Sequence, residues 1–322
     1  MADAIIRVEN LEKRFVLKSG LFGRRSTVHA VNGVTLDIRR GETFGLVGES
    51  GCGKSTLGRM ILKIHEPDAG RILCDGVDIT GFDHKQMHPY RRRMQMIFQD
   101  PYASLNPRFT VGELIAEPMK IYRMCDERAQ TARVQELLET VGLKPDHIRR
   151  YPHEFSGGQR QRIGIARTLA LDPEFIVCDE PISALDVSIQ AQIVNLLERI
   201  QAERGLSYLF IAHDLTMVRH ISRRIGVMYM GSLVESGDAD EVCDRPLHPY
   251  TKLLMSAVPQ PDPVTARRQS RIVPTGEVPS PIDLPPGCPF APRCRYAAPR
   301  CRQERPPLRD VGGRQVACHH VT

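Results

Sequence analysis

The sequence has no stretch of about 18 to 20 consecutive apolar residues, the length that a membrane-spanning helix needs. Its first segment, MADAIIRVENLEKRF, has neither the apolar core nor the cleavage site of a secretory signal. We therefore expect a cytosolic chain that would need a partner for any role at a membrane. The net charge of +6 is mild and forms no basic stripe with interleaved aromatic residues, so composition predicts no nucleic-acid partner.

The nine cysteines occur in a chain of 322 residues, which is long enough for two or three structural units. Because structural disulfides are rare in a reducing compartment, we expect free thiols or metal ligands. The scattered cysteines are predicted to be small buried apolar residues. They are Cys52, Cys74, Cys125, Cys178 and Cys243.

The first part of the chain is predicted to contain strands followed by a helix. Residues 5–47 include segments such as VTLDIRR and TFGLVG, whose apolar and β-branched residues favour short strands. Directly after them, Leu57, Ile61 and Ile64 recur at helical spacing, which predicts a helix from Ser55. This order of strand, glycine-rich loop and helix frames the strongest motif of the sequence.

The remainder of the chain alternates between helix and strand. Residues 110–148 are predicted to form a helical insertion, with an apolar stripe that includes Val134, Leu137 and Leu138. The segments FIVC and SYLFIA read as short buried strands with a helix between them, so the main sheet should be largely parallel. Residues 259–308 are rich in proline and arginine and are expected to form a separate, loop-rich element.

The segment GESGCGKST is a complete G-x-x-x-x-G-K-S/T pattern placed after a predicted strand and before a predicted helix. Its residues, which we expect to bind a nucleotide, are Gly48, Ser50, Gly51, Cys52, Gly53, Lys54, Ser55 and Thr56, with Glu49 between the first two. In such a loop the backbone N–H groups turn inward around phosphates, and the helix N-terminus adds partial positive charge. Lys54 would reach the β- and γ-phosphates, and Ser55 would hold Mg²⁺.

Two adjacent carboxylates, Asp179 and Glu180, end the predicted strand FIVC. Ligands of open α/β sheets bind beyond the carboxyl ends of the strands, where these side chains would lie. Asp179 would then hold Mg²⁺ through water, and Glu180 would orient or deprotonate the attacking water. Alone, such a pair fits a solvated strand end equally well; downstream of a phosphate loop it favours nucleotide hydrolysis.

A third motif, Ser156-Gly157-Gly158-Gln159, follows Phe155 at the start of a predicted helix. A phosphate loop alone would fit kinases, GTPases and helicases, whereas FSGGQ resembles the signature motif of ATP-binding-cassette (ABC) ATPases. Further matches follow in family order over residues 5–240, although each residue by itself would fit an ordinary core or strand-end position. They are Phe15 (adenine-stacking aromatic), Gln99 (Q-loop), Ser183 to Asp186 (D-loop) and His213 (switch histidine).

This resemblance implies a fold, a reaction and an assembly. It implies a RecA-like P-loop NTPase core of the α/β class, with an antiparallel β subdomain and a helical subdomain near residues 102–165. The ABC ATPase domain would cover residues 1–245, and a C-terminal extension residues 246–322. Glu180, His213 and Gln99 would act in ATP hydrolysis, with Gln99 also a ligand of Mg²⁺ and Asp186 near the nucleotide. The signature residues would act on ATP held by a second cassette, so that two cassettes sandwich two nucleotides.

The tail narrows the resemblance to one subfamily. RPLHPYTKLLMSAVP and TGEVPSPIDLPPGCPFAPRC resemble the C-terminal extension of dipeptide and oligopeptide importer ATPases, and the polar loop from Lys18 to Thr27 fits one of their two paired subunits. Importers of nickel and other small solutes carry similar extensions. The resemblance implies a paralogous cassette as partner, two membrane permease subunits and an extracytoplasmic solute-binding protein. The chain would then lie peripherally on the cytoplasmic face of the membrane.

The sequence argues against two other classes of ABC protein. A soluble ABC ATPase of DNA repair or translation usually fuses two cassettes or inserts a coiled coil or zinc module, and the sequence has neither feature. A cassette that only regulates a partner would have lost hydrolysis, whereas Lys54, Asp179, Glu180 and His213 are intact.

The last four cysteines, Cys288, Cys294, Cys301 and Cys318, lie in a proline-rich segment too short for a large core of its own. Four thiolates suit a [4Fe–4S] cluster or tetrahedral zinc, and free thiols are the third alternative. The C-x-x-C pairs of a zinc ribbon are absent, and the family resemblance favours iron–sulfur. The neighbouring His319 and His320 are expected to be solvated.

Overall fold

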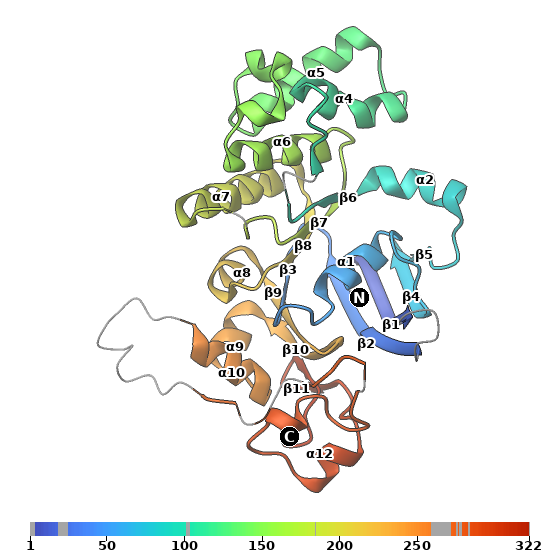
Figure 1. The fold of residues 1–322 in the computed structure, drawn as a ribbon, viewed down its shortest axis with the longest axis vertical. Helices are drawn as coiled ribbons and strands as arrows, with labels where there is room; N and C mark the ends of the chain where they lie inside the picture. The colour runs from blue at the N-terminus through green and yellow to red at the C-terminus, as the bar shows by residue number, and fades with distance from the viewer. Residues whose placement is uncertain are drawn as a thin grey trace. The chain divides into compact units, whose positions relative to one another are not determined.

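The structure is a computed structural model whose chain divides into two compact units (Figure 1). The first unit comprises Met1–Arg39, Thr43–Gly81 and Ala212–Thr322, and the second comprises Arg40–Glu42 and Phe82–Ile211. The residues described are 4–18, 25–100, 104–183, 185–258, 272–274, 276, 279–282 and 284–321. Within these ranges, no helix combines the length and the apolar character needed to cross a membrane.

The elements of the first unit are β1 (Ala4–Lys18), β2 (Arg25–Arg39), β3 (Thr43–Val47), α1 (Lys54–Ile61), β4 (Ala69–Cys74), β5 (Val77–Asp78), α8 (Leu215–Ile221), β9 (Arg224–Tyr229), β10 (Ser232–Asp238), α9 (Ala239–Asp244), α10 (Pro249–Ala257), η3 (Ala291–Arg293), α12 (Pro299–Gln303), β11 (Arg309–Val311) and β12 (Arg314–Val316). Those of the second unit are α2 (His84–Arg93), β6 (Met94–Ile97), α4 (Val111–Ile121), α5 (Glu127–Thr140), η1 (Pro145–Arg149), η2 (Pro152–Glu154), α6 (Gly157–Leu169), β7 (Phe175–Asp179), α7 (Val187–Arg204) and β8 (Ser207–Ile211).

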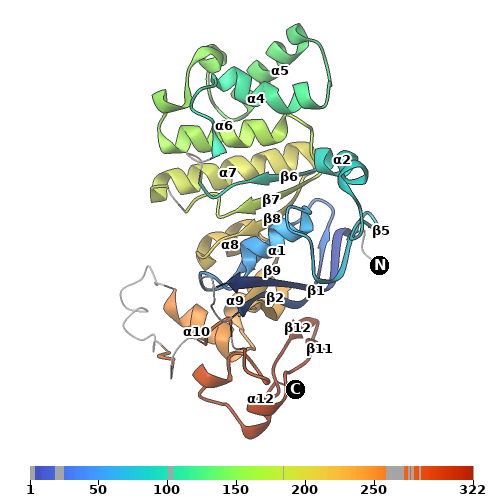
Figure 2. The ribbon, with the colours of Figure 1, turned by 45° about the vertical axis from the view of Figure 1, so that its right-hand side comes forward.

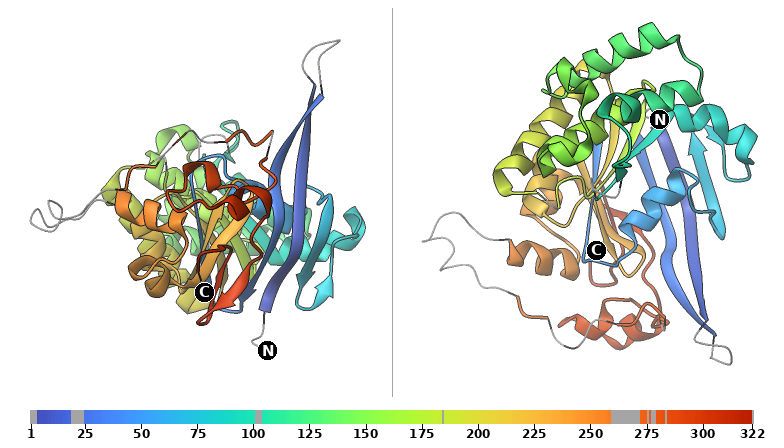
Figure 3. Two further views of the ribbon diagram at one scale, coloured as in Figure 1. Left: turned by 90° about the horizontal axis from the view of Figure 1, so that it is seen from below. Right: turned by 45° about the horizontal axis from the view of Figure 1, so that its top comes forward.

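The first unit contains an antiparallel sheet with the order β2-β1-β4-β5. Its two longest strands, β1 and β2, form the extended ribbon visible in Figure 3 (left). Each contains 15 residues, so the prediction of short strands was wrong for these two, whereas β3, with 5 residues, is short as predicted. In the same unit β9 pairs in parallel with β3 and antiparallel with β10. Every residue of β3 is buried, as expected for a strand covered on both faces.

The second unit combines parallel strands with a group of helices. β6, β7 and β8 pair in parallel and in that order, which confirms the predicted alternation of strand and helix. α4, α5 and α6 contact one another, and α6 also contacts β6 and α7 (Figure 2). Val134, Leu137 and Leu138 are buried on α5, which confirms the predicted stripe. The boundaries at residues 102 and 165 stay a prediction, since residue 102 lies outside the described ranges.

The described part of residues 259–308 is not the separate element predicted from its composition, because it belongs to the first unit, where Arg293 and Arg305 bond to Glu49 and Asn32. Beyond these residues, β12 pairs antiparallel with both β10 and β11. The carboxylate of Glu235 on β10 is fully buried and accepts the N–H groups of Leu247 and His248 at 2.9 and 2.8 Å. The chain that leaves the cassette is therefore held to β10 at once.

Three smaller expectations need correction. α1 ends at Ile61, so Ile64 lies outside it and is 52% exposed. The scattered cysteines are buried at Cys52, Cys74 and Cys178 but only half-buried at Cys125 and Cys243. Of the polar loop expected at Lys18 to Thr27, residues 19–24 lie outside the described ranges, and the residues after them belong to β2.

His248 caps α10 with its ring, because Nδ1 accepts the N–H of Tyr250 at 3.1 Å. The side chain is 1% exposed, and burial, helped by the charge of Lys252, lowers the pKa of His248 to about 3. The folded chain thus keeps this imidazole neutral.

Stability should therefore fall between pH 7 and pH 5. The unfolded chain protonates His248 near pH 6.5 and the folded chain does not, so stability is lost as pH falls below 6.5, by about 2 kcal/mol at pH 5. Urea unfolding at the two pH values measures this loss. His248→Asn keeps a capping side chain that does not titrate, so its pH dependence should be smaller by that amount. Equal pH dependence of the two proteins would contradict the prediction.

Candidate nucleotide-binding site

The loop after β3 lies in the first unit and makes close backbone contacts at both ends. Gly48 has φ 155° and Gly53 has φ 101°. A Cβ at Gly48 would lie 2.2 Å from the carbonyl oxygen of Met228, and one at Gly53 would lie 2.1 Å from that of Ala30. Glycine is therefore required at both positions by conformation and by space. The loop leads directly into α1, whose N-terminal N–H groups can bind an anion.

Lys54 is the first residue of α1 and is 4% exposed. Its ammonium group donates to the carbonyl oxygens of Gly48 and Glu49 at 2.9 and 3.0 Å. The neighbouring Cys52 is buried, and this burial raises the pKa of its thiol although the charge of Lys54 opposes the shift. The loop thus presents one fixed cation, next to a neutral thiol, at a helix N-terminus. A phosphate group suits this chemistry.

Glu49 is bound by residues that lie about two hundred positions further along the chain. Its backbone N–H donates to the hydroxyl of Tyr250 at 2.9 Å. Arg293 Nη1 donates to both carboxylate oxygens of Glu49, at 3.1 and 3.0 Å. Neither Glu49 nor Arg293 was predicted to be a site residue, because nothing in the local sequence pattern indicates a contact of such long range.

In the second unit the two expected carboxylates lie at the end of β7. Asp179 is 1% exposed, and Glu180 follows with φ 45°, a strained value for a residue with a side chain. Gln99 Nε2 donates to Glu180 Oε2 at 2.8 Å, so these two predicted residues are brought together. The amide oxygen of Gln99 keeps its capacity to bind a cation. Strain at Glu180 fits a residue held for chemistry and not for packing.

The signature segment begins α6 as predicted. Ser156 is exposed, and it forms a capping box in which its Oγ accepts the N–H of Gln159 and Gln159 Oε1 accepts the N–H of Ser156. Gly157 is the first residue of the helix. Gly158 is buried against α7, where a Cβ would lie 2.5 Å from Ile189 Cγ2, so no larger side chain fits at this position. An exposed hydroxyl at a helix N-terminus can meet an anion supplied by another molecule.

The other predicted residues lie on several different elements. Phe15 on β1 is half-buried, with its ring edge-on to His65 at 5.6 Å. His213 and Asp186 are exposed, the first before α8 and the second at the start of α7. Ala184 of the expected D-loop lies outside the described ranges, while Ser183 Oγ donates to the carbonyl oxygen of Glu180 at 3.1 Å.

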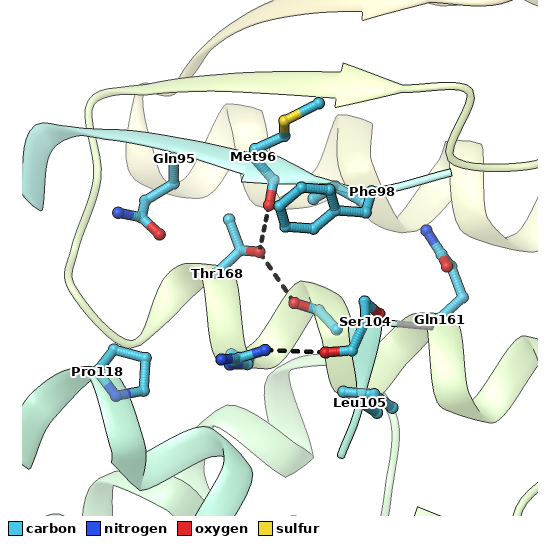
Figure 4. Close-up of a pocket in the computed structure, with 11 residues that line it drawn as sticks. Gln95, Met96, Phe98, Ser104, Leu105, Pro118, Gln161 and Thr168 are labelled. Atoms are coloured by element: carbon cyan, nitrogen blue, oxygen red, sulfur yellow. Dashed lines mark hydrogen bonds between the residues drawn. The ribbon is translucent and has the colours of Figure 1, made fainter. Parts of the chain in front are cut away.

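A pocket of about 160 Å³ lies in the second unit beside β6 (Figure 4). Phe98 and Thr168 face it, and Thr168 Oγ1 bonds to the carbonyl oxygen of Met96 at 3.3 Å. Arg167, which also lines the pocket, donates to the carbonyl oxygen of Ser104 at 3.0 Å. None of the described residues that line the pocket carries a carboxylate, so the hydrolytic chemistry is not placed there.

The four C-terminal cysteines do not form a ready ligand set. Among the described residues, no group of three or more His, Cys, Asp or Glu side chains could hold a metal ion, so the structure does not support the expected cluster. The sulfur of Cys301 lies 3.5 Å from His320 Nε2. Burial raises the pKa of Cys288 to about 11, and negative charge on Cys318, Cys301 or Cys294 acts in the same direction. The four thiols therefore lie within electrostatic range of one another, and the Cys288 thiol stays neutral near pH 7.

Known proteins match the chain along nearly its whole length. The ABC transporter family matches residues 31–183, and the oligopeptide/dipeptide transporter C-terminal region matches residues 234–301. The putative oligopeptide transport ATP-binding protein YkfD of Bacillus subtilis is 58% identical over 92% of this chain and 91% of its own. The dipeptide transport ATP-binding protein DppF of Escherichia coli is 45% identical over 100% of this chain and 96% of its own.

A solved structure carries the same fold. The ATP-binding cassette MJ0796, described as a dimer in a post-hydrolysis state with ADP and Pi, matches with a TM-score of 0.64 and 28% identity. The match covers 73% of this chain and 98% of that cassette. The expected P-loop NTPase fold of the α/β class is thereby confirmed. The chain belongs to the ABC transporter family, as an ATP-hydrolysing cassette of the type that carries the oligopeptide/dipeptide transporter C-terminal region.

Proposed function

We propose that this chain drives the uptake of dipeptides or oligopeptides by hydrolysing ATP beneath a membrane permease. One observation carries the substrate class: the ABC motifs and the oligopeptide/dipeptide C-terminal region occur in one chain, which is 58% identical to an oligopeptide transport ATP-binding protein. In this proposal residues 1–245 are the ATPase domain, with a helical subdomain near 102–165, and residues 246–322 are the extension. The partners are a paralogous cassette, two permease subunits and an extracytoplasmic solute-binding protein.

The phosphate loop would bind ATP in the first unit. The backbone N–H groups of Gly48 to Thr56 and the α1 N-terminus would surround the phosphates, and Lys54 would exchange its bonds to carbonyl oxygens for bonds to the β- and γ-phosphates. Phe15 would stack on the adenine. Because Lys54 is already held at the loop, little ordering of this side chain would be needed on binding.

Asp179, Glu180 and Gln99 would supply the hydrolytic groups of the second unit. Gln99 and Asp179 in this unit offer an amide and a carboxylate oxygen, and Ser55 in the first unit offers a hydroxyl; each is a donor of the kind that Mg²⁺ prefers, so the chemistry of each residue fits this ion. When bound, Mg²⁺ would neutralise negative charge on the β- and γ-phosphates. Glu180 would take a proton from the attacking water, and the 2.8 Å bond from Gln99 would orient its carboxylate. His213 would stabilise charge that develops on the γ-phosphate.

The signature residues would act on the nucleotide of the partner cassette. The hydroxyl of Ser156 and the N–H groups of Gly157 and Gly158 are proposed to bind that γ-phosphate, with Asp186 beside it. Support comes from the exposure of Ser156 and Asp186 in this chain. Hydrolysis then removes the group that bridges two cassettes, so that the ATP state biases an equilibrium between paired and separated forms.

The permease is proposed to contact the second unit near Gln99. In the second unit Phe98, the residue before Gln99, is 46% exposed and Phe109 is 42% exposed. Phe98 also borders the pocket beside β6 (Figure 4). Exposed aromatic side chains commonly anchor protein interfaces. A peripheral position on the cytoplasmic face of the membrane would follow from this contact.

Glu180→Gln should lower steady-state ATP hydrolysis by about 10² or more, since it removes the general base, while ATP binding stays intact. Phosphate release and equilibrium nucleotide binding measure the two properties. Glu139→Gln, an exposed glutamate on α5, is the matched control and should leave both unchanged. Unchanged turnover of the Glu180 variant would remove Glu180 from the mechanism.

Ser156→Asp should separate binding in one chain from capping of another. Aspartate keeps the α6 cap but places a negative charge against the partner's γ-phosphate, so hydrolysis by the assembled transporter should fall about tenfold or more. ATP affinity of the isolated chain should change less than about twofold on the same argument. Ser156→Asn keeps the cap without charge and is the control. A comparable loss of affinity in the isolated chain would contradict action on the partner's nucleotide.

The four-cysteine cluster remains a prediction from the sequence, and no step above depends on it. Because the Cys288 thiol is neutral near pH 7, metal binding would release protons. Assays of iron, acid-labile sulfide and zinc in the anaerobically purified chain decide the metal. Cys288→Ser should lower iron and sulfide, and Cys125→Ser should not. Nine freely titrating thiols would contradict the cluster.

A further inference from the structure

We propose that the C-terminal extension positions the phosphate loop through Glu49, with Arg293 and Tyr250 as positioning residues for ATP binding. The inference rests on the proposed role of the loop from Gly48 to Thr56 in holding the phosphates. Neither Arg293 nor Tyr250 belongs to an ABC motif of the sequence. Both act through Glu49 and not on the nucleotide.

Glu49 is bonded both to the C-terminal extension and to Lys54, the positively charged residue of the phosphate loop. Its carboxylate binds Arg293 at 3.0 Å, its N–H donates to the Tyr250 hydroxyl, and its carbonyl oxygen accepts Lys54 Nζ at 3.0 Å. A displacement of Glu49 therefore moves an acceptor of Lys54 as well as the loop backbone. Three bonds of different kinds leave this residue little freedom.

Arg293 sits in an apolar and aromatic setting that makes its bond to Glu49 hard to replace. Its side chain is 8% exposed, and its guanidinium lies 5.9 Å from the ring centroid of Tyr229 and 6.0 Å from that of Phe290. The Tyr250 ring packs against both of these rings, at 4.5 and 5.4 Å. Arg293 is buried whereas the Glu49 side chain is 33% exposed, so removal of Glu49 would leave a buried guanidinium charge uncompensated, and the two residues should be energetically coupled.

A second route links the extension to the other side of the same loop. Arg305 donates to the carbonyl oxygen of Asn32 at 3.1 Å and to the hydroxyl of Ser232. The N–H of Asn32 donates to the carbonyl oxygen of Gly231 at 2.7 Å, and the N–H of Gly231 donates to that of Cys52 at 2.9 Å. The extension thus holds the loop at Glu49 directly and at Cys52 through two backbone bonds.

These contacts bear on affinity more than on the chemical step. A loop with several glycines samples many conformations, and ordering it on binding would cost affinity. Contacts that order the loop beforehand lower this cost. Loss of Arg293 should therefore weaken ATP binding and raise KM, while kcat changes little because the groups that act on water are untouched.

A double-mutant cycle on the full chain tests the coupling, with the Kd for Mg²⁺-ATP as readout. Arg293→Ala and Glu49→Ala should each raise Kd by about three- to tenfold, and the double variant should be no worse than the worse single variant. Arg314→Ala is the matched control, because the Arg314 side chain is 13% exposed and lies 3.6 Å from the carboxylate of Glu235, with bonds to the carbonyl oxygens of Glu241 and Arg245, which lie outside the loop. Its Kd should stay within about twofold of the unchanged chain, as expected for a distant site.

Two gentler variants guard against misfolding. Tyr250→Phe removes only the hydroxyl that accepts the Glu49 N–H and should raise Kd about threefold or more. Arg293→Lys keeps the positive charge and should restore most of the affinity lost in Arg293→Ala. In the assembled transporter, Tyr250→Phe should raise KM for ATP and leave kcat within about twofold.

Because binding free energies are reciprocal, ATP should slow hydrogen exchange in residues 288–303, and this protection should be lost in Arg293→Ala.

The outcomes separate this inference from the assignment of the site. Lys54→Ala is the reference: if it leaves Kd unchanged, the proposed phosphate loop is wrong. If Lys54→Ala weakens binding while the effects of Arg293→Ala and Glu49→Ala multiply independently, only the positioning role is overturned. If Arg314→Ala raises the Kd for Mg²⁺-ATP as much as Arg293→Ala does, the positioning role is also overturned. A general loosening of the extension would then explain the loss of affinity.

Discussion

The conformation of the loop between β3 and α1 depends on Glu49, a residue that motif patterns leave unspecified. Its carbonyl oxygen holds Lys54, its N–H meets Tyr250, and its carboxylate pairs with Arg293. The glycines at both ends let the backbone approach Met228 and Ala30 closely, but they also make the loop soft. The three bonds of Glu49 restrict this flexibility. The conformation of the loop therefore depends partly on Tyr250 and Arg293, which lie far from the loop in sequence.

The second unit relies on a shorter-range arrangement. Asp179 and Glu180 end a strand buried along its whole length, and the strained backbone at Glu180 turns its side chain toward Gln99. The capping box at Ser156 is local, because serine and glutamine three residues apart satisfy each other's backbone N–H groups. Rigid strand ends and helix ends therefore carry the groups proposed for hydrolysis and for capping of a partner's nucleotide.

Sequence reasoning succeeded where the determinants are local and failed where they are not. The loop at Gly48 to Thr56, the parallel strands and the start of α6 follow from patterns within a few residues of one another, and the structure has all three. The bond between Glu49 and Arg293 spans most of the chain, so no periodicity indicates it. Residues 259–308 were expected to be separate because proline and arginine are abundant there, but two of these arginines, Arg293 and Arg305, bond to Glu49 and Asn32. Proximity of four cysteines in sequence likewise does not predict that their sulfurs converge.

The pairing of β12 with β10 has a consequence for biosynthesis. A ribosome makes the loop at Gly48 to Thr56 well before it makes Arg293 and β12. Until then β10 keeps an unpaired edge next to the buried carboxylate of Glu235, and Glu49 lacks its arginine. On the inference above, a nascent cassette would hold its phosphate loop less firmly until these residues are made, and it would meanwhile expose a strand edge on which another chain can pair.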